Sequence, residues 1–198
     1  MTVGLKTEKV SLRNDIRTRL KSMTPDQRAV ASQQACALLE QQPLWKQAKL
    51  ILFYAPLPQE IDLWRLLQDS IAAGKTTALP RFDAATQRYV ACEVKELTRD
   101  LKHGEFGIRE PAGHCMAISS KPLDLILVPG VAFDLQGRRL GRGKGFYDQL
   151  LASVRGMTCG VAFDEQIVDR VPVEPHDIHL NCILTPTRWI EPWRAILK

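Results

Sequence analysis

The hydrophobic residues near the start of the chain recur with the period of a helix. Leu12, Ile16, Leu20 and Met23 lie four, four and three residues apart, which places them on one face of an α-helix. Basic residues stand between them and predict a basic outer face for this helix: Arg13, Arg17, Arg19 and Lys21.

A second helix is predicted to begin directly after Thr24. Thr24 can cap the helix, Pro25 suits its first position, and Gln27 can complete a capping box. We expect this helix to run to about Gln41.

The next segments alternate between strand and helix patterns. Leu50–Tyr54 is a short apolar run that ends before Pro56, which predicts a buried strand. Ile61–Ala73 returns to helical spacing and stops at Gly74, and Thr76–Leu79 predicts another strand. This β-α-β order implies a parallel sheet with covering helices.

The second half of the chain continues the alternation. A central strand, a helix and two further strands are expected at Leu125–Val128, Phe146–Val154, Cys159–Ala162 and Cys182–Leu184. Arg81–Ser120 is less regular, and there we expect a hairpin-like strand near Tyr89–Glu93 and a long loop. The pattern predicts an α/β fold, a three-layer sandwich around a mostly parallel, mixed β-sheet. No repeat or linker interrupts it, so residues 1–198 are interpreted as a single domain.

Composition agrees with an ordinary globular protein. The chain has 198 residues, of which 45% are hydrophobic and 25% charged, enough apolar content to exclude a disordered tail. Lys and Arg number 27 against 22 Asp and Glu, which leaves a net charge of +5. This charge favours an anionic partner without identifying it.

The five cysteines are scattered without a Cys-x-x-Cys pair, so neither a disulfide framework nor a four-cysteine zinc site is expected. The N-terminal residues lack an apolar core followed by a small-residue cleavage site. Leu123–Phe133 is the longest mostly apolar stretch and is well short of the roughly 20 residues that span a membrane. We expect a cytoplasmic protein without a membrane partner, and a monomer.

The segment with the most distinctive chemistry is Gly137–Gly145. It contains four glycines and four permanent cations: Arg138, Arg139, Arg142 and Lys144. It follows the clearest predicted strand and precedes a helix, the position at which α/β proteins bind ligands. Glycines let the backbone approach an anion, and a helix N-terminus adds partial positive charge. These features predict a polyphosphate-binding loop.

Two common phosphate-binding fingerprints do not fit this loop. A P-loop requires Ser or Thr after its lysine, but Gly145 follows Lys144. The pattern Gly-x-Gly-x-x-Gly fails because Phe146 stands where its third glycine belongs. A solvated basic turn and a nucleic-acid-binding loop remain as alternatives. No aromatic series for base stacking accompanies the cations, so we expect a nucleotide or similar small molecule and no nucleic-acid partner.

Several segments, taken in order, form a long and specific pattern. Val128–Asp134 precedes the loop, and Arg-Leu-Gly-x-Gly-x-Gly-Phe-Tyr-Asp runs from Arg139 to Asp148. Further matching pieces lie at Lys9–Arg13, Phe53–Glu60, Leu79–Phe82, Gly107–Pro111 and Val171–Ile178. Over nearly its whole length the chain resembles the 5-formyltetrahydrofolate cyclo-ligase family, also called methenyltetrahydrofolate synthetases.

This resemblance implies an ATP-dependent ring closure. In such a reaction 5-formyltetrahydrofolate becomes 5,10-methenyltetrahydrofolate, ADP and phosphate are released, and Mg2+ is required. The formyl oxygen is expected to take up the γ-phosphoryl group before nitrogen 10 closes the ring. The protein's contribution would then be mainly positioning and charge neutralisation.

The resemblance also implies roles for individual residues. ATP would be bound by two N-terminal cations and the loop: Lys9, Arg13, Arg139, Leu140, Gly141, Arg142, Gly143, Lys144, Gly145, Phe146 and Tyr147. The folate substrate would be bound by Ala55, Glu60, Arg142, Gly143, Lys144, Gly145 and Phe146. Arg142 and Lys144 are the expected catalytic residues, and Asp148 and Asp177 are the expected Mg2+ ligands.

Other functions are compatible with the same residues. Without the resemblance, Lys9 and Arg13 are typical of a solvated helix face, Glu60 of a helix cap, and Asp148 of a first-turn acid that favours the helix dipole. The main alternative is a non-catalytic paralogue that binds folate or another anion. A basic nucleic-acid-binding module is a further alternative, and it predicts strongly salt-dependent binding.

Overall fold

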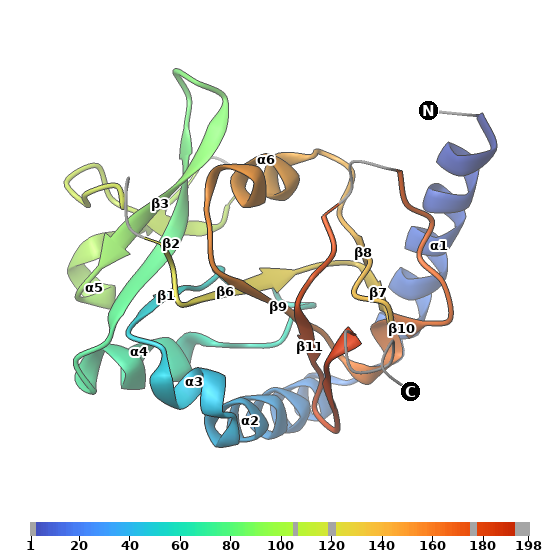
Figure 1. The fold of residues 1–198 in the computed structure, drawn as a ribbon, viewed down its shortest axis with the longest axis horizontal. Helices are drawn as coiled ribbons and strands as arrows, with labels where there is room; N and C mark the ends of the chain where they lie inside the picture. Colours follow the sequence, from blue (N-terminus) through green and yellow to red (C-terminus); the bar gives the residue numbers. More distant parts are fainter. Residues whose placement is uncertain (1–2, 105–106, 119–121, 175–177, 193–198) are drawn as a thin grey trace.

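The computed structural model describes residues 3–104, 107–118, 122–174 and 178–192 (Figure 1). The helices are α1 (Val3–Lys21), α2 (Pro25–Gln41), α3 (Pro43–Gln47), α4 (Trp64–Ala72), α5 (Leu97–Asp100), α6 (Phe146–Ser153) and the short 3-10 helix η1 (Asp164–Gln166). The strands are β1 (Leu50–Leu52), β2 (Thr76–Asp83), β3 (Arg88–Val94), β4 (Leu101–His103), β5 (Arg109–Pro111), β6 (Leu125–Pro129), β7 (Ala132–Asp134), β8 (Arg139–Leu140), β9 (Met157–Val161), β10 (Ile167–Val168), β11 (Cys182–Leu184) and β12 (Trp189–Ile190).

Among the described residues, seven strands form the main sheet in the order β12-β11-β9-β6-β1-β2-β3. The inner strands run parallel, whereas the edge strands β12 and β3 run antiparallel to their neighbours. Two smaller sheets, β10-β7-β8 and β4-β5, lie beside it. The main sheet is therefore mixed and mostly parallel, as the sequence predicts.

Alternate residues of the central strand point to opposite faces of the sheet. In β6, Leu125 and Leu127 belong to one hydrophobic core, whereas Ile126 and Val128 belong to the other. Side chains on a strand alternate with a period of two, so a strand that is buried on both faces is apolar at every position. Burial on both faces therefore explains why Leu125–Val128, the predicted central strand, is an unbroken apolar run.

Helices cover both faces of the sheet. Residues of α1, α2, α3 and α4 belong to the first core, while α6 contributes Leu150 and Leu151 to the second. Figure 1 shows α2, α3 and α4 on one side and α6 on the other. The crossovers from β1 to β2 and from β6 to β9 move across the sheet in opposite directions. Because such crossovers are right-handed, their helices lie on opposite faces, which confirms the three-layer sandwich.

The two N-terminal helices confirm the predicted pattern. Ile16 and Leu20 of α1 are buried, although α1 begins earlier in the chain than the periodic residues suggest. Thr24 and Gln27 form the expected capping box. Helix α2 ends at Gln41, as predicted.

The segment after Leu79 contains more regular structure than the sequence predicts. Strand β2 continues to Asp83 and pairs antiparallel with the whole of β3, from Thr77 opposite Val94 to Asp83 opposite Arg88. The hairpin strand expected near Tyr89–Glu93 is confirmed by β3, whereas the long loop is wrong where β2, α5, β4 and β5 occupy this segment. The end of this edge hairpin carries polar residues, so it lacks the apolar run that identifies a central strand.

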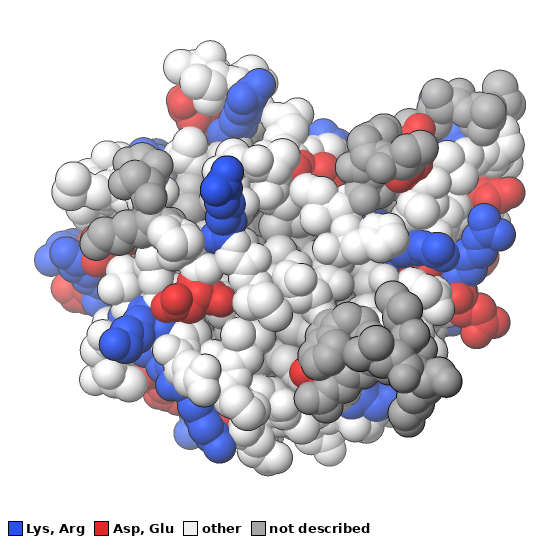
Figure 2. All heavy atoms as spheres, viewed as in Figure 1, with Lys and Arg blue, Asp and Glu red and all other residues white. Residues whose placement is uncertain are grey.

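The distribution of charge on the surface and the character of the helices add two observations. On the face drawn in Figure 2, the Lys and Arg side chains stand apart, with neutral and acidic residues between them. Among the described residues, no helix combines the length and the apolar character that crossing a bilayer requires.

Candidate functional site

The site lies where the order of the strands reverses. Strands β1 and β6 are neighbours at the centre of the sheet, and the chain leaves β1 toward β2 but leaves β6 toward β9. The loops that follow their carboxyl ends therefore diverge and leave a crevice, which is where α/β proteins bind ligands. A cavity of about 410 Å³ opens at this point.

Three parts of the chain form the walls of this cavity, which we call the central cleft. The segment after β1 contributes Tyr54, Ala55, Leu57 and Glu60. The edge hairpin and β5 contribute Pro80, Tyr89, Ile108 and Glu110. The end of β6, the glycine-rich segment and helix α1 contribute Pro129, Gly130, Arg139, Gly141, Arg142, Lys144, Gly145, Phe146, Tyr147, Asp148 and Arg17.

Two glycines shape the loop between β8 and α6. Gly145 caps α6 with φ of 70°, and Gly143 has φ of 101°. L-residues rarely adopt such angles, so glycine is favoured at both positions. A Cβ on Gly143 would lie 3.5 Å from the Arg13 guanidinium. The loop is thus shaped so that α1 packs closely against its backbone.

Arg139 anchors the start of this loop. Its Nη1 donates to the Pro129 carbonyl at 3.1 Å, and its Nη2 forms an ion pair with Asp148. Its guanidinium also lies 5.9 Å from the centre of the Tyr147 ring. The side chain is only 5% exposed, so Arg139 joins β6 to the first turn of α6 and holds the loop between them.

A buried carboxylate holds the other end of the same segment. Asp134 is fully buried, and its Oδ1 accepts hydrogen bonds from the backbone N–H groups of Gln136 and Arg138. Its Oδ2 accepts from Val171 N at 2.9 Å. These contacts fix the turn that leads from β7 into β8, and hence the point at which the glycine-rich segment begins.

An ion pair crosses the central cleft. Arg142 Nη2 donates to Glu60 Oε1 at 2.7 Å, although the two residues are far apart in sequence. Glu60 Oε2 also accepts from Leu57 N at 3.0 Å. When the Gln59 amide is oriented to satisfy its neighbours, its oxygen accepts from Arg142 as well. Two residues that are predicted to bind ligands therefore contact each other directly.

Tyr89, Phe146 and Tyr147 form an aromatic wall of the cleft, and Phe82 packs against the first two of them. The ring centres of Phe82, Tyr89 and Phe146 lie 5.5 Å from one another, with edge-to-face geometry. Tyr147 continues the group, 6.5 Å from Tyr89. Such a wall offers apolar surface and ring edges to a flat heterocycle.

The phenols of Tyr54 and Tyr147 remain protonated near neutral pH. Burial, followed by the charge of Glu60, raises the pKa of Tyr54 and of Tyr147 well above the ordinary value. The Tyr54 hydroxyl donates to the Ile61 carbonyl at 2.8 Å. Tyr54 thus holds the segment that carries Glu60 in place.

The cations of α1 meet the glycine-rich segment from the other side. Lys9 Nζ lies 3.3 Å from Glu174 Oε2, and Arg13 Nε donates to the Gly141 carbonyl at 2.9 Å. Of the four cations expected on the outer face of α1, Arg17, Arg19 and Lys21 are exposed as predicted, whereas Arg13 packs on the loop.

The predicted site residues fall into two groups. Ala55, Glu60 and most of the loop residues line the central cleft. Lys9, Arg13, Gly143 and Leu140 are not among the described residues on its wall. Leu140 has its side chain in the core, so any contact it makes with a ligand would be through its backbone.

Of the predicted Mg2+ ligands, only Asp148 can be placed. It lies on the cleft wall in the first turn of α6, with its side chain 51% exposed and paired with Arg139. Asp177 lies outside the described residues. An exposed carboxylate beside a phosphate-type loop suits Mg2+, which prefers carboxylate and phosphate oxygens.

Several residues of the cleft are not identified by the sequence pattern. It predicts Tyr89 only as a strand position and Glu110 only as part of a motif. Glu110 is buried on the cleft wall. Arg17 follows Lys9 and Arg13 at four-residue intervals, so helical spacing alone could have indicated it.

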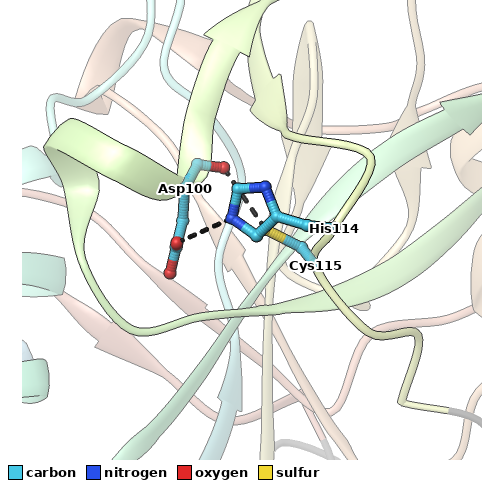
Figure 3. Close-up of side chains that lie close together, drawn as sticks. All are labelled: Asp100, His114 and Cys115. Carbon is cyan, nitrogen blue, oxygen red and sulfur yellow. Dashed lines mark hydrogen bonds and ion pairs between the residues drawn. The ribbon is translucent and has the colours of Figure 1, made fainter.

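A second polar cluster lies away from the central cleft. Figure 3 shows Asp100, His114 and Cys115 close together, and their potential ligand atoms lie within 4.8 Å of one another. His114 Nε2 lies 3.0 Å from Asp100 Oδ1, and Cys115 Sγ donates to the Asp100 carbonyl at 3.4 Å.

The same carboxylate is already fully engaged. Asp100 Oδ1 also accepts from Arg99 Nε at 2.7 Å, and Oδ2 accepts from the backbone of Lys95 and Glu96. Arg99 in particular places a positive charge on the oxygen that a metal would need. Burial also raises the pKa of Cys115, which disfavours the thiolate that binds metals. We interpret this cluster as a structural tie rather than a metal centre.

Fold and site together define a class of protein. A mostly parallel sheet carries a basic, glycine-rich loop at the carboxyl ends of its central strands, opposite an aromatic wall. This arrangement is typical of α/β proteins that bind an anionic small molecule together with a planar group.

Comparison with known proteins gives the family. The model of the 5-formyltetrahydrofolate cyclo-ligase family matches residues 5–186, and the chain belongs to this family. The 5-formyltetrahydrofolate cyclo-ligase of Escherichia coli (strain K12) is 31% identical over 180 residues, which is 87% of this chain and 97% of that protein. The 5-formyltetrahydrofolate cyclo-ligase of Mus musculus is 29% identical over 202 residues, which is 92% of this chain and 95% of that protein.

A solved structure agrees with this assignment. The 5,10-methenyltetrahydrofolate synthetase of Aquifex aeolicus matches with a TM-score of 0.84 and 32% identity, over 93% of this chain and 92% of that one. The likeness therefore extends over most of the fold.

Proposed function

We propose that this protein catalyses the ATP-dependent conversion of 5-formyltetrahydrofolate to 5,10-methenyltetrahydrofolate, within a single domain that spans residues 1–198. The observation that carries the proposal is the central cleft, in which Arg142 and Lys144 of the glycine-rich loop share one cavity with Glu60 and the aromatic wall. Family membership supports the same activity, and a non-catalytic paralogue is not favoured.

The reaction requires a leaving group to be made from a formyl oxygen. That oxygen attacks the γ-phosphorus of ATP, the bond to the β-γ bridging oxygen breaks, and ADP leaves with the electron pair. Nitrogen 10 then attacks the formyl carbon and loses its proton to solvent, a ring forms, and the carbon–oxygen bond breaks to release phosphate. Phosphate is a good leaving group where an oxide is not, which explains the need for ATP.

The loop suits the first of these steps. Negative charge develops on the transferring phosphoryl group, and fixed cations in a cleft stabilise it without further reorganisation. We assign this role to Arg142 and Lys144, with Gly141 and Gly145 allowing the phosphates to approach the backbone. Arg139, Phe146 and Tyr147 shape the same surface. Lys9 and Arg13 lie behind the loop and would bind the nucleotide from the side of α1.

The opposite wall suits the pterin ring. Glu60 can accept hydrogen bonds from the donor edge of that ring, and the aromatic wall can pack against it. Arg142 already pairs with Glu60 at 2.7 Å, so folate binding would exchange this ion pair for contacts with the substrate. Ala55 is small and lines the same cavity.

We further propose that Mg2+ accompanies ATP. Asp148 would hold the ion together with Asp177, and the ion would neutralise charge on the phosphate oxygens. The Asp148 carboxylate now pairs with Arg139, so its second oxygen is the one directly suited to an ion. A cytoplasmic location is proposed from the free cysteines, all five of which lack a disulfide. A monomer remains a prediction that sedimentation would check.

A spectrophotometric assay tests the function. Purified protein is mixed with 5-formyltetrahydrofolate, ATP and Mg2+, and the absorbance of methenyltetrahydrofolate is followed over time. We expect absorbance to rise only when ATP is present, with one ADP released for each product molecule. A folded protein that binds 5-formyltetrahydrofolate but yields no product would instead support the non-catalytic paralogue.

A further inference from the structure

Helix α1 places three cations on one side at four-residue intervals. Residues four apart on a helix are neighbours on its surface, about 6 Å apart along the axis. Lys9 pairs with Glu174, and Arg13 donates to the Gly141 carbonyl. Arg17, the third of the series, has a different environment.

Arg17 lies on the wall of the central cleft and is exposed, so it belongs to the part of the wall that is open to solvent. Among the described residues, no hydrogen bond or ion pair is found for its side chain, whereas Arg139 and Arg142 are both paired with carboxylates. A guanidinium with five donors and no ion-pair partner among the described residues is suited to bind an oxyanion from solution.

The charge of Arg17 is unfavourable for the helix, because Arg13 carries the same charge four residues earlier. Burial, and then the charge of Arg17, lower the pKa of Arg13, so the two guanidinium groups repel each other. Like charges four residues apart destabilise a helix. An anion that binds near both groups would relieve this repulsion.

We propose that Arg17 is an additional oxyanion-binding residue of the central cleft, which contacts an anionic group of a substrate where the wall is open to solvent. This inference rests on the proposed function. Two sources offer the required chemistry: a phosphate of ATP and a carboxylate on the glutamate of the folate. Both present paired oxygens that match the fork of a guanidinium.

Arg17→Ala is the test variant and Arg19→Ala is its matched control. Arg19 is an exposed arginine on the same helix, so its loss removes the same charge and the same side chain. We expect Arg17→Ala to raise a substrate KM about tenfold, the effect of one lost charged hydrogen bond. Arg19→Ala should leave KM and kcat near wild type, and Arg17→Lys should recover part of the loss.

Two arms distinguish the sources. If Arg17 binds phosphate, the KM for ATP rises and the defect is the same with 5-formyltetrahydropteroate, a substrate that lacks the glutamate. If Arg17 binds the carboxylate, the KM for 5-formyltetrahydrofolate rises and the defect disappears with the pteroate. Either result supports the proposal. Equal KM values for Arg17→Ala and Arg19→Ala with every substrate would overturn it.

A binding measurement separates this inference from the proposed function. The rise in Tm on adding inorganic tripolyphosphate or 5-formyltetrahydrofolate is recorded for wild type and both variants. We expect at least one rise to shrink in Arg17→Ala alone, and this readout does not require turnover. Failure of the wild type to make product would contradict the proposed function, whereas unchanged Tm rises in Arg17→Ala would contradict the role of Arg17.

Discussion

At the scale of the residue, the cleft is organised by ion pairs that a ligand can rearrange. Arg142 is 44% exposed and pairs with Glu60, while Arg139 is buried and pairs with Asp148. The buried pair holds the loop in place. Separating its partners would be costly, because it would leave a buried charge without compensation. The more exposed arginine can exchange partners at lower cost, which suits a residue that contacts substrate.

Replacement of Lys144 gives a first prediction at this scale. Lys144→Ala should lower kcat/KM by roughly 10²- to 10³-fold, the usual effect of losing one preorganised charge from a transition state. Initial rates in the ring-closure assay measure the effect. Lys46→Ala removes an exposed lysine from α3 and serves as the control. A Lys144→Ala enzyme with near-normal kcat/KM would contradict the proposed role of this lysine.

At the scale of the element, the loop between β8 and α6 depends on backbone conformations that are rare in L-residues. Gly145 caps α6 with positive φ, and Arg139 and Asp134 hold the segment on both sides. The start of α6, which lies on the cleft wall, is therefore held in a fixed position. The effect of backbone strain on stability can be measured separately from its effect on ligand binding, because Gly74 has a similar positive φ and is not on the cleft wall.

Gly145 and Gly74 make a matched pair. They have φ of 70° and 77°, and a Cβ on either would meet nothing within 4 Å. Each change to Ala should therefore lower the unfolding free energy by about 1 kcal/mol through backbone strain alone. Only Gly145→Ala should also reduce ATP-dependent activity, because its strain shifts the loop. Urea denaturation and initial rates measure the two effects, and equal activities would show that the loop tolerates the shift.

At the scale of the whole molecule, the cleft wall is completed by segments far from the central strands. Strand β5 and the residue before it bring Glu110 and Ile108 to the cleft. The tie made by Asp100 with Arg99 and His114 holds this region together. The stability of the wall should therefore respond to the charge of one buried carboxylate.

Acid should weaken this tie. The hydrogen bond from Arg99 is the largest cause that lowers the pKa of Asp100, and His114 and two backbone N–H groups add to it. A folded-state pKa below the ordinary value of about 3.9 contributes stability that is complete above that pH. The contribution is lost as pH falls further, through the lowered pKa.

Asp100→Asn tests this dependence. At pH 7 the free energy of unfolding of the variant should be about 2 kcal/mol lower than that of wild type. This difference should shrink below about pH 4. Urea denaturation at pH 7, 5 and 3 measures it. Asp69→Asn, which changes an exposed acid on α4, should stay within about 0.5 kcal/mol of wild type. A difference that stays constant with pH would contradict the role assigned to the Asp100 charge.

The sequence by itself determined the fold class, the central strand, the capped second helix and the glycine-rich loop. These features depend on local rules: the period of apolar positions, cap residues and glycines within a few positions of one another. The ligand roles of Lys9, Glu60 and Asp148 came from family resemblance, since local spacing was equally compatible with helix faces and caps.

Only the tertiary structure decided which of these residues share a cavity. Glu60 meets Arg142 because β1 and β6 are neighbours at the reversal of strand order. Tyr89 and Glu110 reach the cleft through the edge hairpin and β5, and a strand pattern alone does not tell which cavity its residues line. Arg17 turns toward the cleft because α1 packs on the loop. Each contact joins segments far apart in the chain, so its position depends on the packing of the whole sheet rather than on neighbouring residues.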